Sequence, residues 1–226
     1  MADVVCVGAH PDDVEIGMGG TVAALATAGS DVLIVDLTDG EPTPHGTHER
    51  RMAEAAEAAR LLGCRRVTLD LPNRYLFDGV DARMALAEVL RLERPRVLFV
   101  PYAEDAHPDH VAAARIAEAA RFYAKLTKTQ MRGEPHYPAR LYRYMAVHLR
   151  LVREPSFLAD ITQTLPAKLA ALGAYRSQFG ENAANAEVIG LVDQTARTWG
   201  GIGRVGAAEP FFALEPPVVS SVLDLR

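Results

Sequence analysis

The sequence has little cysteine, and this argues against two kinds of cysteine-rich structure. Cys6 and Cys64 are the only cysteines among 226 residues, and neither belongs to a CxxC or similar ligand spacing. A cysteine-rich structural zinc site and a disulfide scaffold are therefore not expected. Cys6 lies inside an apolar run and Cys64 follows a helical pattern, so we interpret both as reduced packing residues.

Long apolar runs and dense basic clusters are absent too. Met1 to Asp3 lead directly into a short strand pattern, without a basic segment and a long apolar stretch. We therefore expect no signal peptide, no membrane anchor or membrane partner, and a cytoplasmic location. Lys and Arg number 24 against 29 Asp and Glu, which gives a net charge of −5. Without a basic cluster to neutralise a run of phosphates, no nucleic-acid partner is expected.

The remaining composition is typical of a globular enzyme-sized domain. Hydrophobic residues make up 49% of the chain and charged residues 23%. A chain of 226 residues can bury one substantial α/β core but is short for two domains of usual size. We expect a single domain over residues 1–226.

Apolar periodicity predicts an α/β fold. Short runs rich in β-branched residues are typical of strands buried on both faces of a parallel sheet, and they occur at residues 4–9, 32–37, 66–71 and 96–101. Helical spacing occupies residues 49–63, ending at Gly63, and residues 81–95. The alternation predicts a doubly wound, mostly parallel sheet with helices on both faces.

The second half of the chain is less regular. Residues 125–138 lose periodicity and are expected to form a surface loop. A strand is expected at 141–147 and a helix around 166–176, whereas the glycine-rich segment 199–206 is left unassigned. The glycines within residues 17–21 do not complete a dinucleotide-binding loop, so we interpret them as allowing close helix packing.

Two His-Pro-Asp motifs follow predicted strands. "AHPDD" (residues 9–13) comes directly after the first strand, and "DAHPDH" (residues 105–110) comes after the strand at 96–101 and before another helical pattern. In an open parallel sheet, ligands bind beyond the carboxyl ends of the strands. Both motifs are therefore expected at one edge of the sheet.

Helix capping explains only part of these motifs. Pro and Asp are common at helix starts, so each motif alone is compatible with a cap. Capping does not explain His10, His107 and His110, because a charged histidine gains nothing from the positive end of a helix dipole. Imidazoles combined with a carboxylate suit Zn²⁺ with a position left open for water, and Fe²⁺ or Co²⁺ accept the same ligands.

The motifs also carry a resemblance to a known family. "AHPDDVEIGMGGT" together with "HPDH" resembles the LmbE-like or PIG-L family of zinc-dependent N-acetylglucosaminyl deacetylases, which have a Rossmann-like fold. Further segments are similar to the bacillithiol-biosynthesis branch, which acts on N-acetylglucosaminyl malate: "VDLTDGEPTPHGTHERRMAEAAEAARLLG", "RYLFD", "PYAEDAHPDH", "YRSQF" and "AEPF". The resemblance implies a three-layer α/β/α fold and extends to about Phe211.

The resemblance assigns roles to the first motif and to the last histidine of the second. His10, Asp13 and His110 would bind zinc. Asp12 would be the general base that takes a proton from a water activated by the metal. A bound zinc lowers the pKa of water from about 15.7 toward ~7, so Asp12 need only accept a proton that is already loosened.

The resemblance gives His107 and Asp109 a joint role and suggests one for Arg51. His107 would be the cation that stabilises the oxyanion and protonates the leaving amine, with Asp109 fixing its orientation and raising its pKa. Arg51 would bind a substrate carboxylate or a hydroxyl pair. The alternative for Arg51 is a solvated helix arginine that pairs with acids such as Glu54.

Several substrates and one other class of protein are compatible with the sequence. The expected reaction is deacetylation of an N-acetylglucosaminyl substrate, with N-acetylglucosaminyl malate as the leading candidate. A chitobiose-like oligosaccharide, a nucleotide sugar or a thiol conjugate would use the same chemistry, and a non-catalytic metal- or sugar-binding protein is the alternative of another class. Asp105 stands where some relatives have a tyrosine, which puts the aglycone in doubt. The resemblance also suggests a homo-oligomer, with a hexamer as the form common among related deacetylases.

Overall fold

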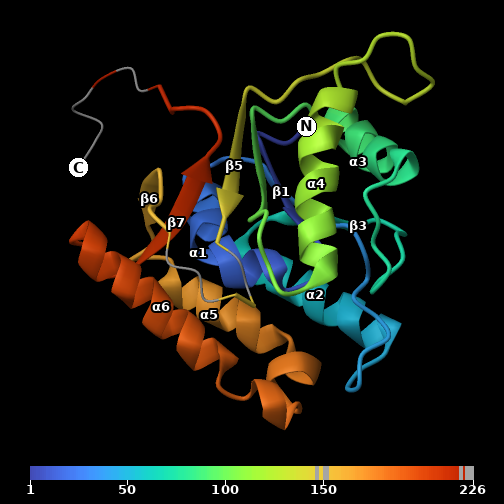
Figure 1. The fold of residues 1–226 in the computed structure, drawn as a ribbon. Helices are drawn as coiled ribbons and strands as arrows, with labels where there is room; N and C mark the ends of the chain where they lie inside the picture. Colours follow the sequence, from blue (N-terminus) through green and yellow to red (C-terminus); the bar gives the residue numbers. More distant parts are fainter. Residues whose placement is uncertain (146–147, 150–152, 219–220, 222–226) are drawn as a thin grey trace.

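The fold is an alternation of strands and helices that ends in an antiparallel extension (Figure 1). The computed structural model describes residues 1–145, 148–149, 153–218 and 221. The first half contains β1 (Val4–Gly8), α1 (Asp13–Thr27), β2 (Val32–Asp36), α2 (His48–Leu62), β3 (Arg65–Thr68), α3 (Val80–Glu93), β4 (Val97–Pro101) and α4 (Pro108–Tyr123). The second half contains β5 (Arg140–Tyr144), β6 (Phe157–Asp160), α5 (Leu165–Ala174), the short helices η1 (Arg176–Gly180) and η2 (Ala183–Asn185), α6 (Val188–Gly203) and β7 (Ala208–Ala213).

The strands form one sheet in the order β3-β2-β1-β4-β5-β7-β6. Strands β1 to β5 run parallel, while β7 pairs antiparallel with both β5 and β6. The predicted α/β class with a mostly parallel sheet is confirmed.

Alternate residues of the central strands feed two separate hydrophobic cores. On one face, Val5 and Val7 of β1 pack with α3 and α4. On the other face, Val4 and Cys6 pack with α1, α2 and α5. Figure 1 shows α3 and α4 side by side, well separated from α5 and α6. The burial of β1 on both faces explains its unbroken apolar sequence and completes the three-layer arrangement.

The sequence predictions were most accurate in the first half. Gly63 ends α2 with φ of 72°, as its place after the helical pattern predicts, and residues 125–138 contain no helix or strand. β5 ends at Tyr144, and residues 146–147 of the expected strand lie outside the described residues. The glycine-rich segment 199–206 forms the end of α6 and the turn into β7. The elements β6, α6 and β7 had no counterpart in the predictions.

The glycines of α1 allow close packing, as interpreted from the sequence. A Cβ at Gly17 would overlap the ring of Tyr144, and one at Gly20 would lie 2.7 Å from Ile161. Between them the helix breaks, because Met18 has non-helical backbone angles. Such a break leaves main-chain N–H groups without acceptors within the helix.

A buried carboxylate from β7 satisfies these donors. Glu209 accepts hydrogen bonds from the main-chain N–H groups of Gly20 (3.0 Å) and Thr21 (2.7 Å) and from the Thr21 hydroxyl (2.6 Å). Lys168 of α5 neutralises it at 2.5 Å, and both side chains are almost fully buried. Glu209 therefore joins α1, α5 and β7 beside the central sheet.

We expect Glu209→Gln to destabilise the protein by about 3–5 kcal/mol, because it leaves Lys168 as an uncompensated buried charge. Thermal unfolding would measure this as a drop in Tm of roughly 10 °C. Glu57→Gln is the matched control, since Glu57 pairs with Arg60 on the exposed side of α2 and is expected to change stability by less than about 0.5 kcal/mol. Equal Tm values for the two variants would contradict the proposal that Glu209 stabilises the contact of α1, α5 and β7.

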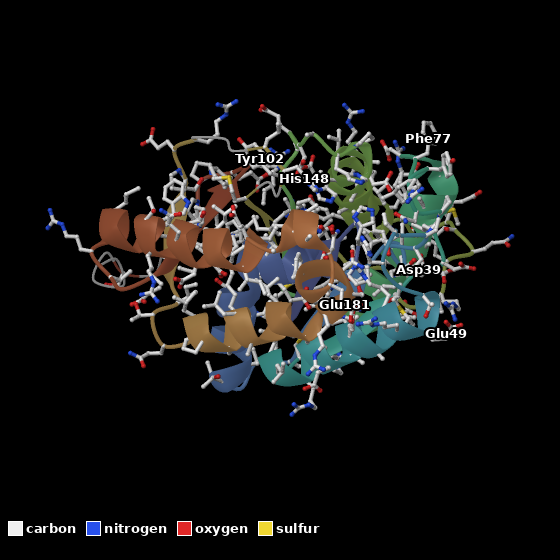
Figure 2. The ribbon with its side chains drawn as sticks, turned by 90° about the horizontal axis from the view of Figure 1, so that it is seen from below. Asp39, Glu49, Phe77, Tyr102, His148 and Glu181 are labelled. Atoms are coloured by element: carbon white, nitrogen blue, oxygen red, sulfur yellow. The ribbon has the colours of Figure 1, made fainter. Side chains whose placement is uncertain are left out.

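The carboxyl ends of the parallel strands lie together along one edge of the sheet, where the strands pass into their loops. Figure 2 looks onto this edge from below. The His-Pro-Asp motifs lie at this edge because β1 and β4 are adjacent and parallel. Separately, none of the described helices is long and apolar enough to cross a membrane.

Candidate metal centre and active site

The first motif forms a strained turn between β1 and α1. Asp12 precedes the helix with φ of 109°, a backbone conformation that costs a non-glycine residue about 1–3 kcal/mol. Its side chain makes no capping hydrogen bond. The Asp13 carboxylate instead accepts hydrogen bonds from the N–H groups of Ala9 and His10, both at 2.9 Å. Capping therefore does not account for the paired aspartates, and Asp13 is fixed by the turn that precedes it.

The second motif begins α4 with a histidine cap. Pro108 occupies the first turn, and Nδ1 of His107 accepts a hydrogen bond from the N–H of Asp109 at 3.1 Å. The Asp105 carboxylate accepts from the N–H of His107 at 3.1 Å. The capping group is thus an imidazole, and the carboxylates of Asp105 and Asp109 are directed to other partners.

Three side chains from the two motifs meet, and we call His10, Asp13 and His110 the metal triad. Nε2 of His110 lies 3.3 Å from Nδ1 of His10 and 3.2 Å from Asp13 Oδ1, while Nδ1 of His10 lies 3.6 Å from Asp13 Oδ2. Ligands held about 2.0–2.1 Å from a tetrahedral zinc are roughly 3.4 Å apart. The donor set and its spacing therefore fit a divalent metal ion, and three protein ligands leave the fourth position of a tetrahedral ion open.

Each triad histidine has a carboxylate on its other ring nitrogen. Asp105 lies 3.0 Å from Nδ1 of His110, and Asp109 lies 3.2 Å from Nε2 of His10. Such outer carboxylates fix the tautomer and the orientation of metal-binding histidines. From the sequence, Asp105 is known only to stand where some relatives have a tyrosine. In the structure it is the hydrogen-bond partner of His110.

The geometry around His107 differs from the sequence expectation. The Asp109 carboxylate bonds to His10 and to the N–H groups of Arg74 (2.6 Å) and Leu76 (3.3 Å), so it does not orient the His107 ring. Because Nδ1 of His107 accepts a hydrogen bond, its proton belongs on Nε2. Burial and the neighbouring His10 and His110 also lower the pKa of His107. The hydrogen bond at Nδ1 and the lowered pKa favour the neutral form of His107, and its role as a cation stays a prediction.

The metal triad concentrates opposite charges in a buried space. Burial opposes protonation of His10, but hydrogen bonds with Asp109 and Asp13 raise its pKa to about 9. Burial likewise opposes protonation of His110, yet Asp13 and Asp105 raise its pKa to about 10. Although burial disfavours the Asp13 anion, His110 and His10 hold its pKa well below the usual value. The carboxylates thus favour a cation between them, and a bound metal ion would provide that charge in place of the histidine protons.

Asp12 lies next to the triad and has the environment of a base. Burial raises the pKa of the Asp12 carboxyl to about 6, although the Arg51 cation counteracts this rise. Nη2 of Arg51 donates to Asp12 Oδ2 at 3.0 Å and to the Pro11 carbonyl at 2.5 Å. A carboxylate with a pKa close to neutral can both accept and release a proton near physiological pH.

Arg51 is not the solvated helix arginine of the alternative interpretation. Its residue is only 3% exposed, and Arg50 takes the ion pair with Glu54. Nε and Nη1 of Arg51 are buried without a hydrogen-bond partner among the described residues, and its guanidinium lies 5.5 Å from the centre of the Tyr175 ring. Arg51 therefore keeps two unused donors beside Asp12.

Two residues near the triad were not identified from the sequence as members of the site. His148 has its ring centroid 5.0 Å from that of His110 and 5.6 Å from that of His107. Tyr175, within the "YRSQF" segment, donates a hydrogen bond to Glu15 at 2.9 Å, and its ring lies against the Arg51 guanidinium. Only the matched "YRSQF" segment pointed toward Tyr175, and no sequence signal marked His148.

Comparisons with known proteins agree with this geometry. The chain is 30% identical over 195 residues to the diacetylchitobiose deacetylase of Thermococcus kodakarensis, covering 79% of this chain and 71% of that protein. It is also 30% identical over 241 residues to a 1D-myo-inositol 2-acetamido-2-deoxy-alpha-D-glucopyranoside deacetylase of Catenulispora acidiphila, covering 77% and 79%. The crystal structure of a conserved protein from Thermus thermophilus superimposes with a TM-score of 0.91 at 40% identity, covering 98% of this chain and 99% of that one.

A family model covers the segment that contains both motifs. Residues 5–121 match the PIG-L family, described as GlcNAc-PI de-N-acetylase. This match includes the metal triad, Asp12, His107 and Asp109. Together with the relatives above, it shows that the chain belongs to the PIG-L family of deacetylases.

Proposed function

We propose that this protein is a zinc-dependent hydrolase that removes the acetyl group from an N-acetylglucosaminyl glycoside. The metal triad carries the proposal, because two imidazoles and a carboxylate converge at ligand spacing beside the Asp12 carboxylate, which Arg51 holds. A bound zinc ion would supply a Lewis acid that polarises the acetyl carbonyl and acidifies water. Fe²⁺ and Co²⁺ suit the same ligands, so metal analysis decides among them.

The protein groups divide the proton transfers between them. Asp12 takes a proton from the attacking water as oxygen bonds to the acetyl carbon. Nε2–H of His107 donates to the carbonyl oxygen, where negative charge develops, and loss of such a donor typically costs on the order of 3 kcal/mol. Breaking the carbon–nitrogen bond then releases acetate and the amine, and the amine receives the proton that Asp12 took from the water. Asp109 acts through His10, whose ring it holds.

The substrate is proposed first as a chemical class and then as one compound. Relatives named for diacetylchitobiose and for an inositol glycoside share an N-acetylglucosamine unit linked to a second ring, so a glycoside of this kind is the leading class. N-Acetylglucosaminyl malate, the substrate suggested by the family resemblance, stays a prediction. It depends on Arg51 as the residue that binds a substrate carboxylate. A single domain, a cytoplasmic location and a homo-oligomer also remain predictions.

Acetate release tests the function directly. The purified protein, loaded with one equivalent of Zn²⁺, would be incubated with diacetylchitobiose, N-acetylglucosaminyl malate, an N-acetylated nucleotide sugar and N-acetylglucosamine. We expect acetate and a free amine in equal amounts from at least one glycoside. A protein that binds zinc yet releases acetate from none of them would instead be a metal- or sugar-binding protein.

Arg51→Ala is expected to raise KM more for N-acetylglucosaminyl malate than for diacetylchitobiose, because a guanidinium binds a carboxylate more strongly than it binds the hydroxyls of a neutral ring. The same variant should move the acid limb of kcat/KM to higher pH, since Arg51 lowers the pKa of Asp12. Steady-state kinetics over a pH series measures both effects. Equal KM changes with the two substrates would leave Arg51 as a positioning residue for Asp12.

A further inference from the structure

The loop between β3 and α3 exposes two large aromatic side chains beside the active site. We call residues 72–79 ("PNRYLFDG") the aromatic segment. Tyr75 is 79% exposed and Phe77 is 77% exposed. Single exposed apolar residues are common, but two on one short segment next to a reaction centre indicate a contact surface. Figure 2 shows Phe77 at the edge viewed from below, on the same side as Asp39 and Glu49.

The active site itself holds the aromatic segment in place. The N–H groups of Arg74 and Leu76 both donate to the Asp109 carboxylate, whose other partner is His10 of the metal triad. The Leu76 side chain is buried in the core, so the intervening Tyr75 and the following Phe77 face outward. One carboxylate thus separates the segment's backbone from the metal triad.

Two turns hold the backbone of the aromatic segment. A turn joins the N–H of Tyr75 to the Pro72 carbonyl, and a second joins the N–H of Gly79 to the Phe77 carbonyl at 2.8 Å. The ring of Phe77 lies against Gly79, with Cδ1 3.4 Å from the position of a Cβ there. A surface fixed in this way loses little conformational entropy when a ligand binds.

We propose that Tyr75 and Phe77 form the subsite for the ring attached to the N-acetylglucosamine unit. This inference rests on the proposed deacetylase function, which places the acetamide at the metal triad and the second ring farther along the same edge. Saccharide and cyclitol rings present C–H faces that pack on aromatic side chains, and their hydroxyls need polar groups at the rim. Arg74 and Asp78 provide that rim, the latter held by Arg83 at 2.6 Å.

The charged rim favours a substrate ring over a second copy of the chain. The centre of a stable interface between subunits is depleted of charged residues, whereas here the charged Arg74 and Asp78 flank the two aromatic residues. The contact to Asp109 also links this surface directly to the reaction centre. The aromatic segment therefore sets the preference for a glycoside with a cyclic aglycone.

The test compares one substrate that has the second ring with one that lacks it. In the zinc-loaded Tyr75→Ala/Phe77→Ala variant, we expect KM for diacetylchitobiose to rise about tenfold with little change in kcat, while kcat/KM for N-acetylglucosamine stays the same. Tyr75→Phe and Phe77→Trp should retain a low KM. Phe122→Ala on α4, 53% exposed and distant from Asp109 along the helix, is the matched control.

Binding and mass measurements separate the possible failures. Saturation-transfer NMR with diacetylchitobiose reports ring contact without turnover, and the double alanine variant should lose that signal. Wild-type protein that binds the disaccharide through these residues but releases no acetate would reject the proposed function alone. Equal losses with both substrates, an unchanged KM, or a changed molecular mass in sedimentation with normal KM would each overturn the subsite.

Discussion

Asp12→Asn should lower kcat by roughly 10²–10⁴-fold while leaving bound metal nearly unchanged. The amide keeps the size of the carboxyl group and can still accept from Arg51, but it cannot take a proton from water. Burial holds the pKa of Asp12 near 6, so wild-type activity depends on its ionised form and should fall as pH decreases through that region. Acetate release over a pH series, with metal analysis of each sample, measures both quantities.

Asp39→Asn supplies the control for this substitution. Asp39 lies at the same edge (Figure 2), and its carboxylate bonds to His48 at 2.8 Å. The exchange is chemically identical, but the group is separate from the metal triad, so kcat should stay close to the wild-type value. Substantial turnover by Asp12→Asn would show that another group accepts the proton.

The meeting of the two His-Pro-Asp motifs could be predicted because it depends on topology alone, whereas the choice of His10, Asp13 and His110 as metal ligands came from the family resemblance and stays a prediction. Parallel strands next to each other bring their following loops together, and β1 and β4 are such neighbours. The residue types of His10, Asp13 and His110 then indicate a metal without any knowledge of rotamers. The same reasoning could not assign Asp109, because whether it faces His107 or His10 depends on the loop that supplies the N–H groups of Arg74 and Leu76.

The second half of the fold was harder to predict for local reasons. Helix α6 contains Gly190, Gly200, Gly201 and Gly203, and glycine lowers helix propensity by about 1 kcal/mol each. Strand β7 contains Pro210, which argues against a strand between two others, yet β7 pairs with β5 and β6. Tertiary contacts such as the Glu209 bonds to α1 stabilise this region, and a single sequence does not display them.

Substitutions at His110 and at its partner Asp105 should lower the zinc affinity by different amounts, because only His110 is a proposed metal ligand. His110→Ala removes one of the three donors and is expected to weaken zinc binding by more than about 100-fold, with loss of acetate release. Asp105→Asn leaves the donor but weakens the carboxylate that orients it, so a loss of about 10–100-fold is expected. Competition with a chromophoric chelator measures both affinities without relying on turnover.

His136→Gln is the reference for this series. His136 bonds to the Pro95 carbonyl at 2.7 Å, far along the chain from both motifs, and its replacement should leave zinc affinity unchanged. Thermal unfolding with and without zinc provides a second reading, because an ion that binds only the folded protein raises Tm by an amount that grows with its affinity. The zinc-dependent rise should be full in His136→Gln, reduced in Asp105→Asn and absent in His110→Ala. A full rise in His110→Ala would mean that the ion binds elsewhere, and the metal triad would then have to be abandoned as the reaction centre.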